Sequence, residues 1–562
     1  MVSHLKTRES TRRLQKVRLL EPPRASSIIR FELPNWSNAL ALAVVAVYLL
    51  VTVGIGLTAR RAARTSSQFL HARRALPTFV TATAFLAANC GALEIVGIVA
   101  TSAKYGALAL HFYWLGAIPA MLFLALFMMP VYARSGAMTV PDFLRVRYGA
   151  PTQIVSALSL AVMMIFVSGI SLYAISSVLT LFFGWSFLRI ALVSSAVILC
   201  YSLAGGLRAT IYNEILQFGL TIVGLIPLSW LVLRRFHGVR PIVHGLPFGI
   251  AHVWASLPLV QPRTATMDVF GLVFGLGLIL SCGYWCTDFI LIQRALAAKD
   301  LQASINTPLF AAVAKLFFPI LVVVPGMAAG IFFRKEGLTG FDQALPYLMR
   351  HYYGYALLGL GISGVLASLM SGLAGNISAF SAVWTHDLYR TYLRRGRSDA
   401  HYVLVGRLSA TTACLLSIFA AYISFRYNNL MDYLQVLFSL FNAPLFAVFL
   451  LGMFTTWATP TAGLCGLLSG VAVAAAHNMA VRYGAIPYGS QMLANFYGAI
   501  YGWVSCIVVV SIVSRFTKPK ASAELKGVTY FTQDRTVRLP RASLLLAAAI
   551  LAACVALNVA FR

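Results

Sequence analysis

GISGVLASLMSGLAGNISAFSAVWTHDLYR, residues 361–390, is apolar and long enough to cross a bilayer, and small residues recur along it every three or four positions. Such positions form one face of a helix. In a membrane, this face indicates either tight helix packing or a path for an ion or solute. The hydroxyls of Ser368 and Ser371 favour the second interpretation, since oxygens one turn apart can coordinate a small cation where water is absent. The small residues are Gly361, Gly364, Ser368, Ser371, Gly372, Gly375, Ala379 and Ala382.

The rest of the chain has the composition of a polytopic membrane protein. Of its 562 residues, 59% are hydrophobic and 11% are charged, whereas about 25% are charged in soluble domains. Apolar runs of about 20 residues predict about fourteen transmembrane helices and a multi-pass protein of the cell membrane. They cover residues 38–58, 78–102, 111–133, 153–181, 187–204, 212–233, 268–293, 308–333, 355–384, 402–424, 431–453, 460–480, 494–514 and 543–561.

The net charge of +28 reflects orientation in a membrane, so we expect contact with lipid and none with nucleic acid. If the first span begins outside, the cytoplasmic loops hold about 22 Lys and Arg residues against about 12 on the other side, and both termini lie outside. The basic tail at residues 1–35 argues for the opposite side. It is a disordered extension, a lipid-headgroup contact or a misassigned start. The sequence indicates no oligomeric state.

Polar residues and glycines interrupt the second and seventh spans at mid-depth. The second span contains Asn89, Gly91 and Glu94, and the seventh contains the run Ser281-Cys282-Gly283-Tyr284-Trp285-Cys286-Thr287-Asp288. An unwound helix frees carbonyls that can bind an ion. The two interrupted spans are five spans apart, which predicts two inverted repeats of five helices around a central site.

Several motifs resemble those of the sodium/solute symporters, which include the sodium/glucose cotransporters. The strongest is Tyr284-Trp285-Cys286-Thr287-Asp288 followed by Gln293-Arg294-Ala295-Leu296-Ala297-Ala298-Lys299. Others are Gly205-Gly206-Leu207 with Glu214 and Gln217, Lys315 with Pro325-Gly326, and Tyr433-Leu434-Gln435 with Pro444.

The resemblance implies an all-α, LeuT-type fold of five plus five helices, with one extra helix before the core and three after it. We therefore expect an N-terminal tail at 1–35, a first extra helix and loop at 36–77, repeats at 78–265 and 266–454, and C-terminal extra helices at 455–562. It also implies a secondary active transporter rather than an enzyme, in which a sodium ion accompanies a small organic solute and no organic cofactor takes part.

The family's sodium site, carried over onto this sequence, places carbonyl ligands at Ala87, Cys90 and Ser368 and hydroxyl ligands at Ser371 and Gly372. Glycine has no hydroxyl, and Gly91 stands where relatives often have serine. Each lost ligand costs on the order of 1–3 kcal/mol unless water replaces it. The sequence therefore predicts sodium coupling that is weakened, and an uncoupled facilitator or solute sensor is an alternative.

Glu94 offers a second alternative, because a carboxyl group at mid-membrane is costly to ionise. It is a proton-coupling group, the partner of a cationic solute, or a neutral group that stabilises the broken helix.

The resemblance also implies the solute-binding residues. Lys315 and Gln435 match sugar-contacting residues, and Tyr284 would gate the solute with Trp285 beside it. Asn89 lies in the same region. Tyr113, Gly116, Ser281 and Glu94 depart from the bacterial sugar transporter's pattern, so the pocket looks poorly suited to a hexose. A buried Lys315 needs a partner, either Glu94 or a solute carboxylate.

Glu214 matches a family aspartate at the cytoplasmic end of the sixth span. It either attracts the departing cation or forms a helix-end ion pair with a loop arginine such as Arg208.

Overall fold

A computed structural model describes residues 35–58, 76–91, 93–137, 139–255, 257–338, 340–427, 429–532 and 539–561. The predicted basic tail and most of the first cytoplasmic loop lie outside these residues. The described part is all-helical apart from one isolated bridge between Leu76 and Ala298.

The α-helices, in chain order, are α2 (Asn35–Thr58), α4 (Thr78–Asn89), α5 (Ile98–Tyr105), α6 (Ile118–Phe123), α7 (Met129–Arg134), α8 (Val140–Tyr148), α9 (Ala150–Phe183), α10 (Phe187–Arg235), α11 (Val239–His244), α12 (Phe248–Ala251), α13 (Cys282–Thr287), α14 (Phe289–Leu296), α15 (Leu301–Glu336), α16 (Ala344–Tyr352), α17 (Tyr355–Ala382), α18 (Asp399–Ser424), α19 (Leu430–Leu437), α20 (Ala443–Phe454), α21 (Pro460–Arg482), α22 (Gln491–Phe516) and α23 (Arg541–Ala560). Shorter π or 3₁₀ segments are η4 (Leu93–Gly97), η5 (Gly106–Leu110), η6 (Phe112–Ala117), η7 (Leu124–Met128), η8 (Gly271–Ser281), η9 (Phe341–Gln343), η10 (Val383–Leu393), η11 (Phe438–Asn442) and η12 (Tyr530–Thr532).

Eleven stretches of the described chain are long and apolar enough to cross a membrane, or twelve if one bent pair forms a single span. Shorter apolar helices at Ala43–Gly56, Thr78–Asn89 and Phe187–Leu203 add to these. The sequence count of fourteen is therefore approximate. The spans predicted at 187–204 and 212–233 both lie within α10.

The second span is broken where the sequence predicts, whereas the seventh stays helical through Ser281–Thr287 and bends only at Asp288, beyond mid-depth. Helix α4 ends at Asn89, a turn follows at Cys90 and Gly91, and the chain resumes as η4. The seventh span bends by 51° between α13 and α14. Asp288 lies at this bend, and its carboxylate accepts a hydrogen bond from the backbone N–H of Ile290 at 2.8 Å. The bend therefore coincides with a new helix N-terminus capped by an aspartate.

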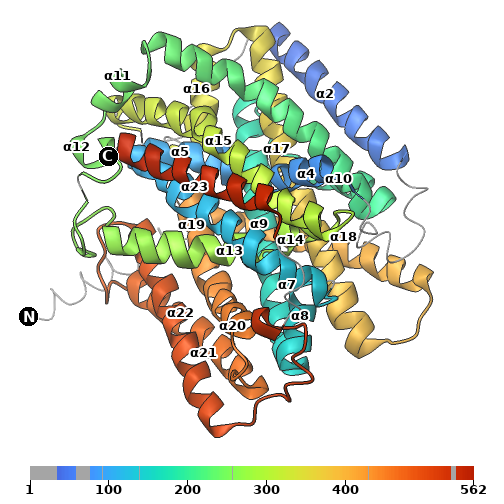
Figure 1. The fold of residues 1–562 in the computed structure, drawn as a ribbon. Coiled ribbons are helices and arrows are strands. Elements are labelled where there is room, and N and C mark those ends of the chain that lie inside the picture. The colour runs from blue at the N-terminus through green and yellow to red at the C-terminus, as the bar shows by residue number, and fades with distance from the viewer. Residues whose placement is uncertain are drawn as a thin grey trace, which may run out of the picture.

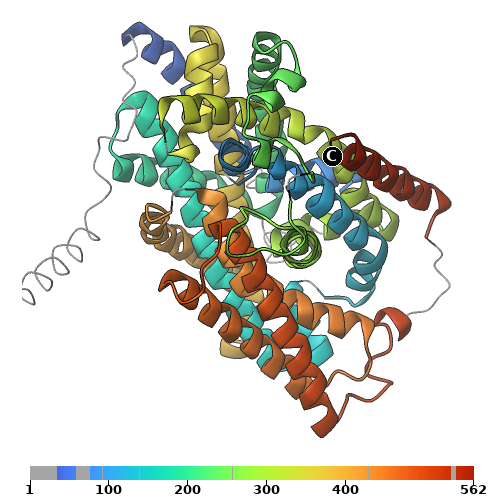
Figure 2. The ribbon, with the colours of Figure 1, turned by 90° about the vertical axis from the view of Figure 1, so that its left-hand side faces the viewer.

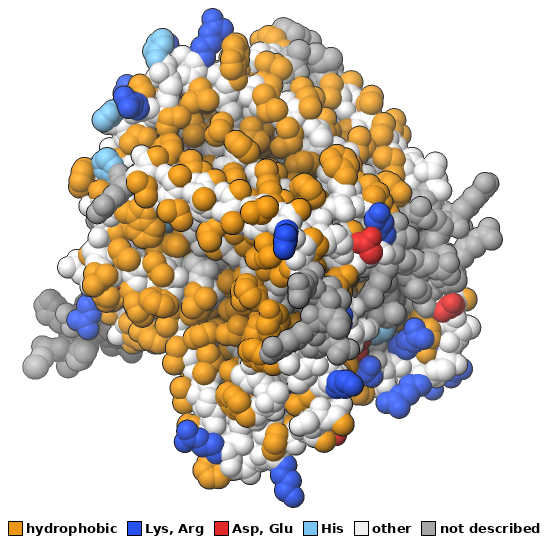
Figure 3. Space-filling model, in the orientation of Figure 1, with side chains coloured by type: hydrophobic (Ala, Val, Ile, Leu, Met, Phe, Trp, Pro, Cys, Tyr) orange, Lys and Arg blue, Asp and Glu red, His pale blue; other side chains and the backbone are white. Residues whose placement is uncertain are grey.

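The broken helices α4 and α13 lie inside the bundle, while α2 lies at its upper edge and α21 and α22 pack against each other at the bottom of both views (Figures 1 and 2). Hydrophobic side chains cover most of the face in Figure 3, and Lys and Arg side chains lie mainly around its margin. This distribution fits a molecule whose sides contact lipid and whose ends contact water.

The small-residue face of residues 361–390 packs on two different neighbours. A Cβ atom on Gly364 would lie 2.9 Å from the carbonyl oxygen of Leu220 and 3.3 Å from Cα of Gly224, both on α10. Further along α17, Ser368 and Ser371 reach the broken helix α4. The first part of this face therefore packs two helices tightly, and its second part faces an interrupted helix.

Candidate functional site

The break after α4 lies against the middle of α17. The hydroxyl of Ser368 donates a hydrogen bond to the carbonyl oxygen of Cys90, and that of Ser371 donates to the carbonyl oxygen of Ala87 at 3.3 Å. Four of the residues that the sequence assigns to a cation site thus meet: Ala87, Cys90, Ser368 and Ser371. Carbonyl and hydroxyl oxygens are the ligands that hard cations prefer, so the donor set fits sodium.

Gly91 and Gly372, the two positions without hydroxyls, face each other across the same contact. A Cβ atom on Gly91 would lie 3.1 Å from Cα of Gly372 and 3.8 Å from the carbonyl oxygen of Ser368. Backbone therefore meets backbone where relatives often carry hydroxyls. Ser368 brings a side-chain hydroxyl from the preceding turn, although the sequence comparison assigned only its carbonyl to the site.

An ion pair lies beside this break. Lys315 Nζ of α15 is 2.8 Å from Glu94 Oε1, and the same ammonium donates a hydrogen bond to Asn89 Oδ1. The hydroxyl of Tyr113 also donates to Glu94 Oε1. The Lys315 side chain is fully buried, while that of Glu94 is 10% exposed. The sequence left the partner of Lys315 open, and the structure identifies it as Glu94.

A cavity of about 70 Å³ opens next to this pair. Its wall is largely apolar and aromatic, with polar groups contributed by few residues. Tyr284 stacks on Phe438 at 5.0 Å between ring centroids, and its hydroxyl accepts a hydrogen bond from the Asn89 amide at 3.0 Å. The lining residues are Asn89, Leu93, Glu94, Ile98, Phe112, Tyr113, Ala117, Leu276, Leu280, Ser281, Tyr284, Trp285, Met431, Leu434, Gln435 and Phe438.

Seven of the eight residues assigned to the solute site line this cavity, and the eighth, Lys315, lies behind Glu94. Gly116 and Ser281 are in contact, because a Cβ atom on Gly116 would lie 2.4 Å from the Ser281 hydroxyl. Gln435 contacts Met431 through its amide nitrogen, and its buried amide oxygen has no hydrogen-bond partner among the described residues. Ser281 therefore both lines the cavity and packs against Gly116, so two positions where the sequence lacks sugar contacts are neighbours.

Glu214 forms a second buried ion pair, and its partner is Arg294 of α14. Its two carboxylate oxygens accept hydrogen bonds from Nε and Nη2 of Arg294, with 3.2 Å to Nε. Both side chains are at most 1% exposed. Arg294 belongs to the signature motif quoted above, so the sequence did point to this residue. Its pairing with Glu214 could not be predicted, because the two residues are 80 positions apart in the chain. The side chain of Arg208 lies outside the described residues.

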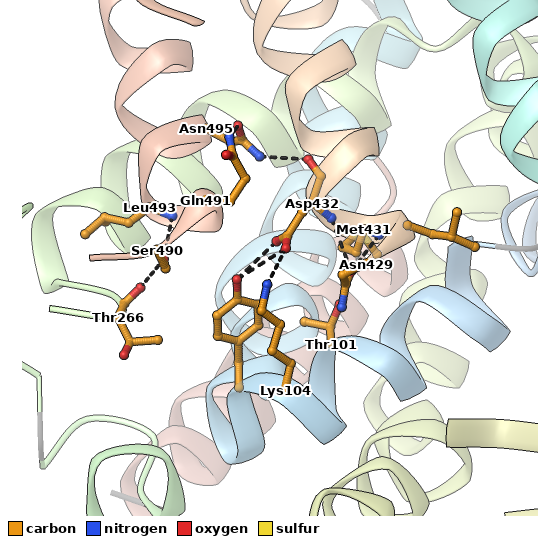
Figure 4. Close-up of polar contacts among 12 residues, drawn as sticks. Thr101, Lys104, Thr266, Asn429, Met431, Asp432, Ser490, Gln491, Leu493 and Asn495 are labelled. Atoms are coloured by element: carbon orange, nitrogen blue, oxygen red, sulfur yellow. Dashed lines mark hydrogen bonds and ion pairs between the residues drawn. The ribbon is translucent and has the colours of Figure 1, made fainter. Parts of the chain in front are cut away.

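A third ion pair, which was not predicted from the sequence, lies at the end of the second span, in α5. Figure 4 shows the carboxylate of Asp432 of α19 facing Lys104 of α5. The Lys104 ammonium is 2.6 Å from Asp432 Oδ2, and the Tyr105 hydroxyl is 3.2 Å from Oδ1. Asn495 donates a hydrogen bond to the backbone carbonyl of Asp432 at 2.8 Å. The sequence offered one signal for this pair, because Lys104 follows the span at 78–102 and Asp432 lies at the start of the span at 431–453.

Comparison with known proteins agrees with this geometry. The model of the sodium:solute symporter family matches residues 69–470, which is more than half of the chain. The chain belongs to the sodium:solute symporter family. Sodium:solute symporters are membrane transporters and not enzymes, so this chain is a multi-pass transporter with a LeuT-type fold.

Several sodium:solute symporters are similar to it over most of their length. The sodium/glucose cotransporter 1 of Ovis aries is 27% identical over 542 residues, which cover 87% of this chain and 80% of the relative. The sodium/glucose cotransporter of Vibrio parahaemolyticus is 24% identical, with 90% and 96% covered. A sodium-coupled sialic acid symporter in a substrate-bound, outward-open state has a TM-score of 0.72 at 17% identity, over 85% of this chain and 98% of that chain.

Proposed function

We propose that this protein is a sodium-coupled symporter that carries a small, uncharged organic solute. The observation that carries the proposal is the adjacency of two sites at one broken helix. The carbonyls of Ala87 and Cys90 meet the hydroxyls of Ser368 and Ser371 on one side, and Asn89 and Glu94 line the solute cavity on the other. An ion and a solute bound to the same interrupted segment would each favour the same backbone conformation, which is how their binding becomes coupled.

The Glu94–Lys315 pair supports an uncharged solute. Its two charges compensate each other at 2.8 Å, so the cavity has no net charge to offer. A charged solute would leave an unpaired charge in a largely apolar space, at a cost of several kcal/mol. The second carboxylate oxygen of Glu94, Oε2, has no partner among the described residues and can accept a hydrogen bond from a solute hydroxyl or amide.

Uptake into proteoliposomes tests this proposal, with sodium and proton gradients imposed separately. We expect accumulation above equilibrium under a sodium gradient. Ser371→Ala should weaken sodium activation about tenfold, because one ligand hydroxyl is lost. Ser363→Ala, which removes a buried hydroxyl elsewhere on α17, is the matched control. Accumulation that ignores the sodium gradient would contradict the proposal.

The solute itself can be found with a thermal-shift screen, because a ligand that binds only the folded state stabilises it. Sugars, polyols and neutral amides form one group, and carboxylates, amines and amino acids form the other. Each compound is tested with and without sodium. Stabilisation by the neutral group, increased by sodium, is the expected result. Stabilisation by charged compounds alone would contradict the uncharged-solute proposal while leaving symport itself intact.

Proton coupling through Glu94 is the second candidate, favoured by a carboxyl group that faces the cavity at mid-span. In that case a proton gradient would drive uptake and Glu94→Gln would abolish the drive. Unchanged uptake by Glu94→Gln at every external pH would eliminate the proton role. Uptake that only equilibrates the solute under both gradients would indicate a facilitator that has lost coupling at Gly372.

A further inference from the structure

A second and larger cavity, of about 650 Å³, lies on the opposite face of the helix that lines the solute cavity. The segment α19–η11 presents Met431, Leu434, Gln435 and Phe438 to the solute cavity. It presents other residues to this second space, which we call the outer cavity: Asp432, Tyr433, Val436, Leu437, Leu440 and Phe441. One helix thus separates the two cavities, so an occupant of one can affect the other through its position.

The outer cavity is lined by three cationic side chains and one carboxylate. That carboxylate, Asp432, already accepts hydrogen bonds from Lys104, as Figure 4 shows, and from the hydroxyl of Tyr105. Arg426 and Arg482 form no ion pair with the residues that the structure describes. The cavity therefore has uncompensated positive charge, on the side that the Lys and Arg distribution predicts to be extracellular.

The two arginines come from different parts of the chain and line the outer cavity together with Tyr427. Arg426 follows the end of α18, and Arg482 is the last residue of α21. Burial raises the pKa of Tyr427, and the charges of Arg482 and Arg426 oppose that shift, so both guanidinium groups act on the same hydroxyl. Tyr427 stacks on Tyr433 of α19 at 4.3 Å with 15° between the ring planes. The stack gives the charged end of the cavity a fixed aromatic wall.

One border of the outer cavity faces the lipid. Ile423 and Met479 line the cavity and are 39% and 62% exposed, and the neighbouring Phe425 is 37% exposed. Such apolar side chains at the ends of membrane helices lie near the headgroups. A ligand can therefore enter from the water or from the outer leaflet.

We propose that the outer cavity binds a phosphate- or carboxylate-type anion between Arg426 and Arg482. Guanidinium groups bind these anions through paired, charge-assisted hydrogen bonds. The anion joins the ends of α18 and α21 behind α19, and it favours the position of α19 seen here. The same chemistry comes either from an anionic phospholipid headgroup or from a soluble anion, and the experiment separates them.

The test uses the full-length protein in nanodiscs and measures the midpoint of thermal unfolding. One arm compares phosphatidylcholine with phosphatidylcholine containing phosphatidylglycerol, and the other adds inorganic phosphate to phosphatidylcholine nanodiscs. Either anion should raise the midpoint in the wild type. Arg426→Gln/Arg482→Gln should weaken the apparent affinity for the anion by about tenfold or more per arginine. The conservative pair Arg426→Lys/Arg482→Lys should keep part of the effect.

Arg240→Gln/Arg263→Gln is the matched control, because it removes the same charge from exposed positions on the same side. This control should respond to anions as the wild type does. A response only to phosphatidylglycerol assigns the site to a lipid, and a response to inorganic phosphate assigns it to a soluble anion. No shift in the wild type, or an equal shift in Arg426→Gln/Arg482→Gln, would overturn the proposal. Because the readout is binding, the result does not depend on which solute is transported.

Discussion

Among the residues that the structure describes, two deeply buried ion pairs differ in what surrounds them. Glu214 and Arg294 are at most 1% exposed and meet through two hydrogen bonds, close to the backbone of Gly375. Glu94 and Lys315 meet through one carboxylate oxygen, and Glu94 lines a cavity. In the first pair, both carboxylate oxygens of Glu214 already accept hydrogen bonds from Arg294. In the second pair, Glu94 Oε2 has no partner among the described residues and lies beside the cavity, where we propose that it accepts a hydrogen bond from the solute.

Breaking the enclosed pair should give the largest loss of stability. Glu214→Gln should cost about 3–5 kcal/mol, because it leaves a buried guanidinium that cannot lose its proton. Arg294→Met should cost less, since the remaining carboxyl group can be protonated. Chemical unfolding in detergent measures both. Replacing both partners, as Glu214→Met/Arg294→Met, should recover most of the loss, and equal losses in all three variants would show that the pair does not act as a unit.

Breaking the cavity pair should affect transport more than folding. Lys315→Met should lower uptake at least tenfold, because Glu94 loses the charge that fixes it beside Asn89. Its stability should fall by about 1–2 kcal/mol, less than for Arg294→Met, because Glu94 can be protonated and reach water in the cavity. Uptake and unfolding measured on the same preparation check this. A stability loss as large as that of Glu214→Gln would remove the distinction between the two pairs.

Tyr113→Phe should sharpen the comparison further, since it deletes one hydrogen bond to Glu94 without changing a charge. We expect a loss of about 0.5–1.5 kcal/mol in solute binding. The thermal-shift midpoint at increasing solute concentration measures it. Tyr132→Phe, which removes a buried hydroxyl bonded to the carbonyl of Cys286 instead, is the control and should leave solute binding unchanged.

Near the outer ion pair, Lys104–Asp432, a further carboxyl group makes stability depend on pH. Asp342, in the loop segment η9, accepts a hydrogen bond from the backbone N–H of Leu430 at 3.0 Å. Burial raises the pKa of Asp342 to about 7, with the bond from Leu430 opposing the shift, the charge of Asp432 adding to it and that of Lys104 opposing it. Because this pKa exceeds the unfolded value of about 3.9, the folded state binds more protons in between, and stability falls as pH rises through this window.

Asp342→Asn should therefore flatten the dependence of the unfolding midpoint on pH between about 5 and 7. Over this range we expect the wild type to lose about 2 kcal/mol more stability than Asp342→Asn. Thermal unfolding across this range measures it, with Asp300→Asn, an exposed N-cap, as the control. Parallel pH profiles for the wild type and Asp342→Asn would contradict the assignment.

Local sequence patterns predicted a helical membrane protein and the break in the second span, because glycines and polar residues inside apolar spans have few structural explanations. They placed the interruption of the seventh span at mid-depth, whereas the bend lies at Asp288. The same patterns placed Asn89, Glu94, Tyr284 and Gln435 around one cavity through the family resemblance. They could not predict the partners of Lys315 and Glu214. Those partners depend on how helices distant in the sequence dock, and several carboxylates were equally available. The Gly91–Gly372 contact could not be predicted either, because it depends on how closely two backbones approach each other.

The pairing of Glu214 with Arg294 has a consequence for how the chain is made. The two residues are 80 positions apart, so at about 5–20 residues per second the ribosome produces Arg294 roughly 4–16 s after Glu214. During that interval Glu214 lacks the guanidinium that pairs with it in the folded protein. Until α14 has been synthesised, we expect either that Glu214 is protonated in the membrane or that α10 remains near the lipid headgroups. The ion pair can form only after both α10 and α14 have been made, so it joins an early part of the transporter to a later one.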